Sequence, residues 1–257
     1  MKLIAIRLFA FLAIFCGHSP AAPNILLILA DDLGYGDVRC YNADSKVPTP
    51  NIDKLAAQGM KFTDAHSPAT VCTPTRYSLM TGQMAFRVPN GGTVFTGAGG
   101  PSLIAKGRLT LPAMLKQHGY ATAAIGKWHI GLTFRDASGG AIHSGRFEDV
   151  KRIDFSRRID GGPLDHGFDH FFGTACCPTT DWLYAFIDGD RIPTPPTSPL
   201  DRSTLPKHPY ANDCRQGLIA PDFDLEEVDM QFLQKSRDFI AEHVRNSPQK
   251  PFFLYHA

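Results

Sequence analysis

The sequence lacks an excess of charge of either sign. Its 257 residues include 26 Lys and Arg against 25 Asp and Glu, which gives a formal net charge of +1. A near-neutral chain exerts no broad electrostatic attraction on nucleic acid or on an anionic membrane surface. We therefore expect no nucleic-acid partner, and any anion that this protein binds must be held by a local group of residues.

The sequence also offers no membrane-spanning segment at its N-terminus, because the apolar run of residues 8–16 is shorter than the roughly 20 residues that a span needs. This run follows Lys2 and Arg7 and precedes small and polar residues, the pattern of a secretory signal peptide over residues 1–22. We expect export, to the periplasm or out of the cell. An uncleaved anchor and a lipoprotein attached at Cys16 are alternatives, and the bulky Phe15 disfavours the second.

The expected mature chain also lacks an even number of cysteines. Removing the signal peptide leaves five of them in a compartment that favours disulfides, so at least one stands apart. The adjacent Cys176 and Cys177 cannot bond each other without strain. The sequence fixes no connectivity for the full set of Cys40, Cys72, Cys176, Cys177 and Cys214.

No internal repeat is visible, and 43% hydrophobic residues suffice for a sizeable core. Strand-like and helix-like patterns alternate, which predicts an α/β fold with a mostly parallel central sheet flanked by helices. The expected strands are residues 24–30, 60–65, 120–126 and 251–255, and the expected helices are residues 50–58, 75–80, 111–118 and 224–244. Residues 133–165 and 190–222 lack periodicity and are expected to form long surface loops.

Two acidic residues mark the end of the first expected strand. Residues 24–30 form an unbroken apolar run, typical of a parallel strand covered on both faces, and Asp31 and Asp32 follow directly. Ligands of open α/β sheets bind at the carboxyl ends of the strands. This pair therefore lies where a site is expected.

Five segments together carry a resemblance to a known family. Residues 72–76 (CTPTR) have the form C-x-P-x-R, with Cys72 just before the first turn of an expected helix. The others are LLILADDLGYGD at 26–37, TPNIDKLAAQGMKFTDAHS at 49–67, GKWHIG at 126–131 and GFDHFFG at 167–173. In their order along the chain, the five segments resemble those of the type I, formylglycine-dependent sulfatases of the alkaline phosphatase-like superfamily. The likeness extends from about residue 24 to residue 257.

The resemblance implies a specific nucleophile at position 72. A maturation enzyme would oxidise Cys72 to formylglycine, whose hydrate is a geminal diol. One hydroxyl attacks the sulfur of a sulfate ester and expels the alcohol. Deprotonation of the second hydroxyl then releases sulfate and restores the aldehyde.

The resemblance also implies a metal site and three cationic or basic side chains. Asp31, Asp32 and the modified residue 72 would ligate Ca²⁺, although oxygen ligands also admit Mg²⁺. Arg76 would hold the hydrated aldehyde, Lys127 would contact the sulfate group, and His129 would act as the base. An extended segment would place the last two on one face.

Other readings stay open at this stage. A phosphonate or phosphate ester hydrolase of the same superfamily would use the same nucleophile, and a non-catalytic sulfated-glycan-binding protein would keep the pocket without oxidising the cysteine. Residues 23–257 are expected to be the N-terminal part of a sulfatase domain, poorly active alone. The resemblance implies an aryl sulfate or a sulfated carbohydrate as the substrate. Other residues receive no catalytic or metal-binding role, namely Asp37, Arg39, His66, His166 and His256.

Overall fold

The computed structural model describes residues 22–207 and 209–257. Apart from Ala22, the predicted signal peptide lies outside the described residues and stays a prediction. No helix in the described part of the chain combines the length and the apolar character that crossing a membrane requires.

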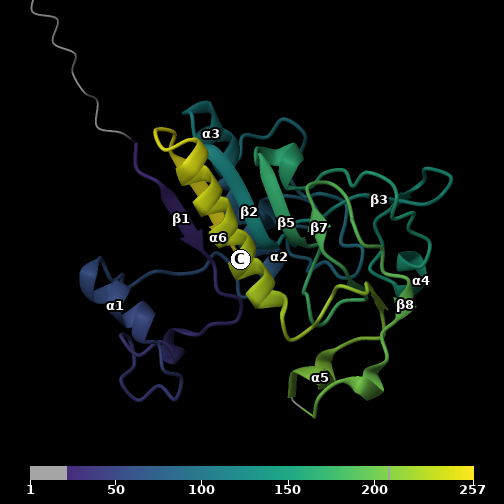
Figure 1. Ribbon diagram of the computed structural model, residues 1–257, viewed down its shortest axis with the longest axis horizontal. Coiled ribbons are helices and arrows are strands. Elements are labelled where there is room, and N and C mark those ends of the chain that lie inside the picture. Colours follow the sequence, from purple (N-terminus) through teal and green to yellow (C-terminus); the bar gives the residue numbers. More distant parts are fainter. Residues whose placement is uncertain (1–21, 208) are drawn as a thin grey trace, which may run out of the picture.

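Helices and strands follow one another in the order that Figure 1 shows. They are β1 (Ile25–Ile28), α1 (Pro50–Gln58), α2 (Cys72–Thr81), α3 (Leu111–Gln117), β2 (Ala121–Lys127), β3 (Phe134–Arg135), β4 (Ala141–Ile142), α4 (Phe147–Val150), β5 (His170–Thr174), β6 (Leu183–Tyr184), β7 (Ile187–Asp188), β8 (Ser198–Pro199), α5 (Pro209–Asp213), β9 (Leu218–Ile219), α6 (Val228–Asn246) and β10 (Phe252–His256). Short 3-10 turns cover Tyr35–Asp37, Ala85–Arg87, Pro163–His166 and Arg202–Thr204.

A five-stranded sheet organises the molecule. Its strand order is β1-β10-β2-β5-β7, and the first four strands run parallel to one another. Only β7, which pairs with β5, is antiparallel. The mostly parallel α/β sheet expected from the sequence is therefore confirmed. Because parallel strands end at the same edge, the residues that follow β1, β2 and β5 meet there.

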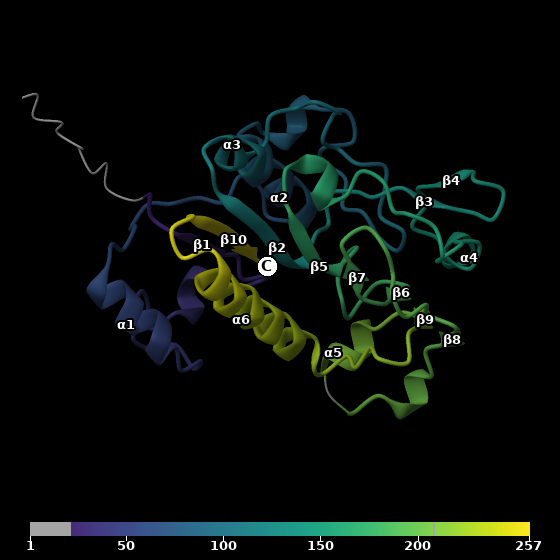
Figure 2. The ribbon, with the colours of Figure 1, turned by 45° about the horizontal axis from the view of Figure 1, so that its top comes forward.

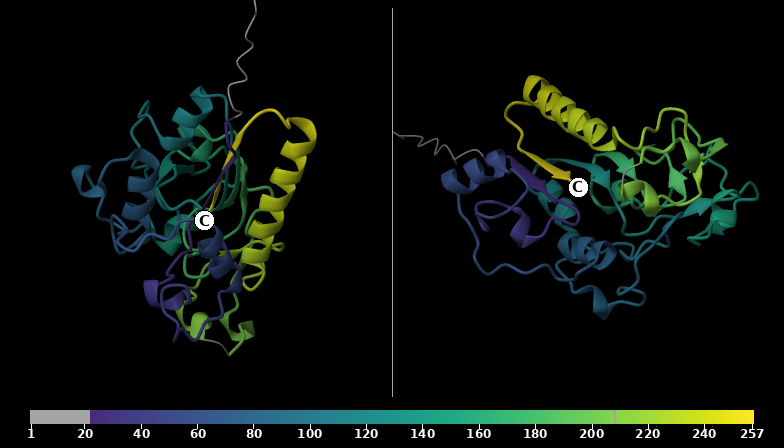
Figure 3. Two further views of the ribbon diagram at one scale, coloured as in Figure 1. Left: turned by 90° about the vertical axis from the view of Figure 1, so that its left-hand side faces the viewer. Right: turned by 90° about the horizontal axis from the view of Figure 1, so that it is seen from below.

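Helices cover both faces of this sheet. Figure 3 shows α6 on one face and α2 and α3 on the other. The expected helix at 224–244 starts four residues later than predicted, and its buried side chains Val228, Phe232 and Ser236 recur every fourth residue, as one helix face requires. The expected helix at 111–118 is confirmed as α3, where the Thr110 hydroxyl accepts a hydrogen bond from the Ala113 amide at 3.2 Å.

Short strands and turns gather beyond β7 into a second, irregular region, which Figure 2 shows around β3, β4, β6, β8 and β9. The prediction of surface loops for residues 133–165 and 190–222 is wrong in part. Phe134, Ile142, Val150 and Leu200 from these segments are buried. Aperiodic segments can pack against one another, and local patterns do not reveal such burial.

Two expectations about strands are wrong. Leu26 and Ile28 of β1 are 50% and 62% exposed, so β1 is not covered on both faces in the described chain. Leu26 and Ile28 alternate with the half-buried Ile25 and Leu27, so the exposed residues share one face of this edge strand and the other face is partly covered. Residues 60–65 form no strand. Met60 and Phe62 are 78% and 64% exposed, and no strand of the sheet pairs with this segment.

Candidate active site

Predicted site residues converge at the carboxyl edge of the sheet. Asp31 lies three residues after β1, and Lys127 is the last residue of β2. Cys72 is the first residue of α2, whose N-cap is Val71, so the helix begins three residues before the predicted range of 75–80 and includes Cys72 instead of following it. Arg76 follows one turn later on the same helix. The fold thus brings together side chains separated by almost one hundred positions in the sequence.

Lys127 lies at the centre of the cluster. Its Nζ donates to Asp31 Oδ2 at 2.5 Å and to Cys177 Sγ at 3.0 Å, and the side chain is only 5% exposed. Burial opposes its positive charge, but Cys177 and Asp31 outweigh that effect and raise the pKa of Lys127 above its usual range. The lysine is therefore a permanent cation at the strand edge.

The Asp31 carboxylate is held by two cations. Besides Lys127, the Arg76 guanidinium approaches it, with Nη2 at 3.6 Å from Oδ2. Burial favours the neutral acid, yet the hydrogen bond from Lys127 and both positive charges lower the pKa of Asp31. Asp31 is therefore an anion at neutral pH, as a metal-binding role requires.

Arg76 is buried, and two of its donor atoms have no acceptor in the described structure. Its Nη1 donates to the Lys127 carbonyl oxygen at 2.5 Å and to the Tyr255 hydroxyl at 3.1 Å. Its Nε and Nη2 atoms find no hydrogen-bond acceptor among the residues that the structure describes, although the side chain is 1% exposed. Buried donors are nearly always satisfied, so these two atoms call for an additional acceptor. An oxygen of the residue at 72 or of a bound anion would supply it.

Cys177 is a member of the cluster that the sequence analysis did not identify. It follows β5, and its Sγ lies within 4.8 Å of Cys72 Sγ. A hydrogen bond from the Cys177 thiol, with a contribution from Lys127, lowers the pKa of Cys72 to about 6, while burial and Asp31 oppose the shift. The same hydrogen bond, together with burial, raises the pKa of Cys177. Asp181 holds Cys177 in place, because its Oδ2 accepts from the Cys177 amide at 2.8 Å.

His129 joins the cluster, but with a backbone conformation that differs from the expected extended one. Its φ of 57° is left-handed, so the segment from Lys127 to His129 is not extended and the premise of a shared strand face is wrong. His129 is nevertheless fully buried, with Nδ1 4.0 Å from Cys177 Sγ and Nε2 2.5 Å from the Phe95 carbonyl oxygen. Lys127 and His129 therefore meet at Cys177 rather than along a strand.

The predicted metal ligands suit a hard cation in kind. Asp31 and Asp32 are adjacent carboxylates, and the left-handed φ of 55° at Asp32 turns the chain sharply at this edge. Two carboxylates supply at most four oxygens, whereas Ca²⁺ takes six to eight. The described residues can thus hold such an ion only together with the oxygen of a modified residue 72 and further oxygen donors.

The three histidines that received no predicted role lie outside the cluster around Lys127. His66 pairs with Asp64 on the surface at 2.7 Å. His166 contacts the Ser102 hydroxyl at 3.0 Å, and His256 contacts the Ser236 hydroxyl at 2.8 Å. Each of the three is 2.7–3.0 Å from a polar partner outside the cluster of Lys127.

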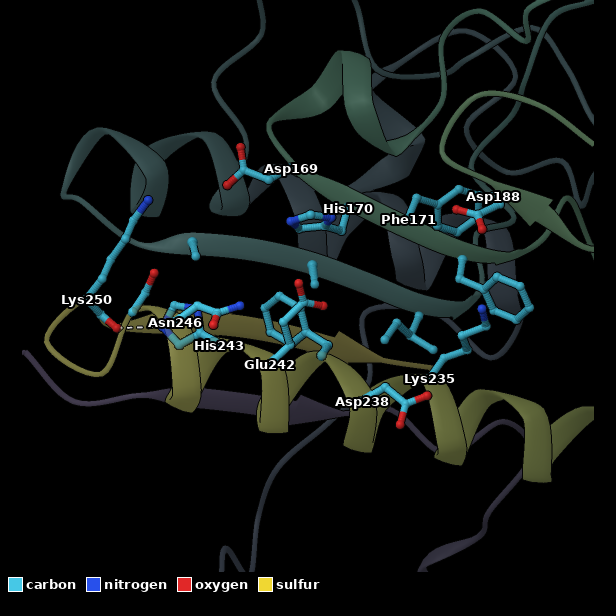
Figure 4. A pocket seen from close by; sticks show the side chains of 16 residues that line it. Asp169, His170, Phe171, Asp188, Lys235, Asp238, Glu242, His243, Asn246 and Lys250 are labelled. Carbon is cyan, nitrogen blue, oxygen red and sulfur yellow. Dashed lines mark hydrogen bonds between the residues drawn. The ribbon is translucent and has the colours of Figure 1, made fainter. Parts of the chain in front are cut away.

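A wide groove elsewhere contains none of the predicted site residues. It has a volume of about 740 Å³ and lies between α6 and the strands β2 and β5, where Figure 4 shows Asp169, Lys235 and Glu242 on its walls. Its lining mixes both charges, and it opens on a face of the sheet rather than at the carboxyl edge. The site is therefore identified by its converging charges and not by cavity size.

Comparison with known proteins gives one consistent result. The model of the family described as Sulfatase matches residues 23–257. The N-acetylgalactosamine-6-O-sulfatase of Bacteroides thetaiotaomicron is 39% identical over 93% of this chain and 48% of its own length. Arylsulfatase G of Mus musculus is 32% identical over 91% of this chain and 40% of its own length. The chain thus spans less than half of these curated relatives.

Solved structures agree. A 6S-sulfatase structure, from work on glycosaminoglycan metabolism by Bacteroides thetaiotaomicron, has a TM-score of 0.71 and 27% identity, covering 91% of this chain and 50% of that one. A sulfatase from Pseudoalteromonas has a TM-score of 0.58 and 26% identity, covering 91% of this chain and 43% of that one. With the family model matching nearly the whole described chain, this protein belongs to the sulfatase family.

Proposed function

We propose that the protein hydrolyses sulfate esters, with Cys72 oxidised to formylglycine as the nucleophile. The observation that carries the proposal is the position of Cys72 at the first turn of α2, beside the buried cations Arg76 and Lys127 and near His129. Formylglycine supplies a hydrated aldehyde, of which one hydroxyl attacks sulfur and the other allows sulfate to be released.

Lys127 and Arg76 would stabilise the anion. Lys127 Nζ lies 3.0 Å from Cys177 Sγ, close to the attacking group, and Arg76 keeps two buried donor atoms without an acceptor in the described chain. Fixed donors in a site of low dielectric stabilise developing negative charge without reorganisation. These two side chains are therefore assigned to the sulfate oxygens and to the hydrated residue at 72.

His129 would move the proton. Its Nε2 faces a carbonyl oxygen, which only accepts hydrogen bonds, so Nε2 carries the hydrogen and Nδ1 offers a lone pair toward the cluster. A ring nitrogen with its lone pair aimed at the site is suited to accept a proton from a hydroxyl of the residue at 72. We assign His129 the role of base at Nδ1.

Asp31, Asp32 and the modified residue 72 would hold a divalent cation, Ca²⁺ in preference to Mg²⁺. A bound cation would polarise a sulfate oxygen and favour the ionised nucleophile. In the described structure, the same Asp31 carboxylate fixes Lys127. Asp31 therefore has two proposed tasks, binding the cation and orienting the lysine.

Asp32→Asn tests the metal site. The expected result is weaker Ca²⁺ binding in titration calorimetry and loss of the thermal stabilisation that Ca²⁺ confers, with activity reduced at least about hundredfold. Asp32 is a cleaner target than Asp31, whose replacement also frees Lys127. Asp64→Asn, on an exposed carboxylate paired with His66, is the matched control. Calcium stabilisation that is equal in Asp32→Asn and in the parent protein would contradict the assignment.

The proposed substrate is a sulfate ester of an aryl alcohol or of a carbohydrate. Relatives named N-acetylgalactosamine-6-O-sulfatase, arylsulfatase and steryl-sulfatase bracket this range. We further propose export of the protein through the signal peptide of residues 1–22, and a formylglycine-generating enzyme as its partner before it becomes active.

Two measurements on the secreted protein test the proposed function. Tryptic peptide mass analysis is expected to find the aldehyde at residue 72, and an aryl sulfate is expected to be hydrolysed faster than the matching aryl phosphonate. The phosphonate comparison addresses the rival hydrolase class, which would share the nucleophile. Faster cleavage of the phosphonate would identify a phosphonate ester, and not a sulfate ester, as the substrate. An unmodified cysteine at residue 72, in a host that has the maturation enzyme, would refute formylglycine as the nucleophile.

A further inference from the structure

Three potential soft-metal ligands meet beside the sheet edge. Cys72 Sγ, a ring nitrogen of His129 and Cys177 Sγ lie within 4.8 Å of one another. They come from the first residue of α2, from the segment after β2 and from the segment after β5. The sheet and the helix thus fix the three donors independently of one another.

His129 is oriented for metal binding. The Phe95 carbonyl oxygen, 2.5 Å from Nε2, fixes the hydrogen on that nitrogen and leaves the lone pair on Nδ1. Nδ1 is the atom that faces Cys177 Sγ at 4.0 Å. A histidine whose other nitrogen donates to a backbone carbonyl is the usual arrangement in zinc sites, because it sets the tautomer and the ring orientation.

The distances are near those of a tetrahedral zinc centre. Bonds of about 2.3 Å to sulfur and about 2.0–2.1 Å to nitrogen place the sulfur and nitrogen ligands about 3.6 Å apart. The observed 4.0 Å between Cys177 and His129 needs a contraction of only a few tenths of an ångström by that estimate. Cys72 is only half-buried and starts a helix, so its side chain has room to adjust.

Charge also favours the centre. Two thiolates would neutralise a divalent cation, and Lys127 donates a hydrogen bond to Cys177 Sγ at 3.0 Å, so a positive charge already faces that sulfur. The charge of Lys127 is itself offset by Asp31 at 2.5 Å. Sulfur and imidazole donors select Zn²⁺, whereas the carboxylates of Asp31 and Asp32 select hard cations such as Ca²⁺.

We propose that the chain with unmodified Cys72 binds Zn²⁺ through Cys72 Sγ, His129 Nδ1 and Cys177 Sγ, with one position open to solvent at the half-buried Cys72. Conversion of Cys72 to formylglycine removes one sulfur ligand. Zinc binding and maturation are therefore mutually exclusive at this site. The inference concerns the unmodified chain and does not depend on the proposed hydrolytic activity.

The test uses the full chain produced in a host without formylglycine conversion and kept reduced with a phosphine. Zinc content after dialysis is measured by atomic emission, and Co²⁺ replaces Zn²⁺ for absorption spectroscopy. The expected result is one Zn²⁺ per chain and an intense thiolate-to-Co²⁺ absorption band. Cys177→Ser is expected to weaken Zn²⁺ binding by more than about tenfold and to diminish the band.

Cys214→Ser is the matched control, because Cys214 is a buried free thiol that does not belong to the group of Cys72, His129 and Cys177. It is expected to keep both the zinc content and the cobalt band. Cys72→Ser, at a half-buried position, provides a second variant should Cys177→Ser fail to fold, which circular dichroism would reveal. Absence of zinc from the reduced parent chain, or an unchanged cobalt band in a folded Cys72→Ser or Cys177→Ser protein, would overturn the proposal.

Discussion

Replacing Cys72 by alanine is expected to lower kcat/KM for an aryl sulfate by at least about 10⁴-fold, because it removes the nucleophile itself. The first turn of α2 accommodates alanine well because alanine favours helix, and Cys72 is only half-buried. We therefore expect the variant to fold. Steady-state kinetics on protein from a host with a maturation enzyme gives the ratio. Labelling with an aldehyde-specific probe should disappear with the activity.

Cys214→Ala provides the control for Cys72→Ala. It deletes a more deeply buried thiol outside the active-site cluster, so it should cost stability but leave kcat/KM and aldehyde labelling unchanged. Substantial sulfatase activity in a folded Cys72→Ala protein would show that another group attacks sulfur, and the formylglycine proposal would fail.

Strong local patterns predicted the elements that frame the site. The expected strands at β1, β2 and β10 and the expected helices at α1 and α3 are confirmed by the structure. The sequence analysis expected no strand at β5, which the structure identifies through its pairing with β2. Pairing is a long-range property that a local pattern does not contain.

The sequence named candidate site residues one by one, but it did not predict how they are arranged. The sequence placed Asp31 at a strand end and Cys72 at a helix start, and the structure places both there. It could not show that Lys127 links Asp31 to Cys177, because that link depends on the register of β2 with β5, in which Lys127 lies beside Thr174. The odd number of cysteines was the one sequence signal that pointed to unpaired thiols.

His129 illustrates why alternation in sequence does not fix direction in space. The expectation that two residues around Trp128 share a face assumes extended backbone. The left-handed φ of His129 breaks that assumption, yet hydrogen bonding to the Phe95 carbonyl returns the imidazole to the cluster. Backbone conformations of this kind are held by tertiary contacts, and functional sites are where they concentrate.

Lys127→Met provides the second large effect. Methionine matches the length of the lysine stem in a buried site, but it removes the only side chain that donates to both Asp31 and Cys177 in the described structure. We expect kcat to fall by about 10²–10³-fold, as for the loss of one preorganised donor to a developing anion.

The matched control is Lys116→Met, which breaks a lysine–aspartate pair of similar length, 2.6 Å to Asp169, away from the cluster. Its lysine is 51% exposed, so screening by solvent makes that pair worth little and activity should be unchanged. Comparing the two variants separates the loss of an ion pair from the loss of a site donor. Equal kcat values in Lys127→Met and Lys116→Met would remove Lys127 from the proposed contacts with sulfate. A lower kcat in Lys127→Met with unchanged thermal stability would instead show that Lys127 acts in the reaction. Loss of a lysine with a purely structural role would lower both kcat and thermal stability.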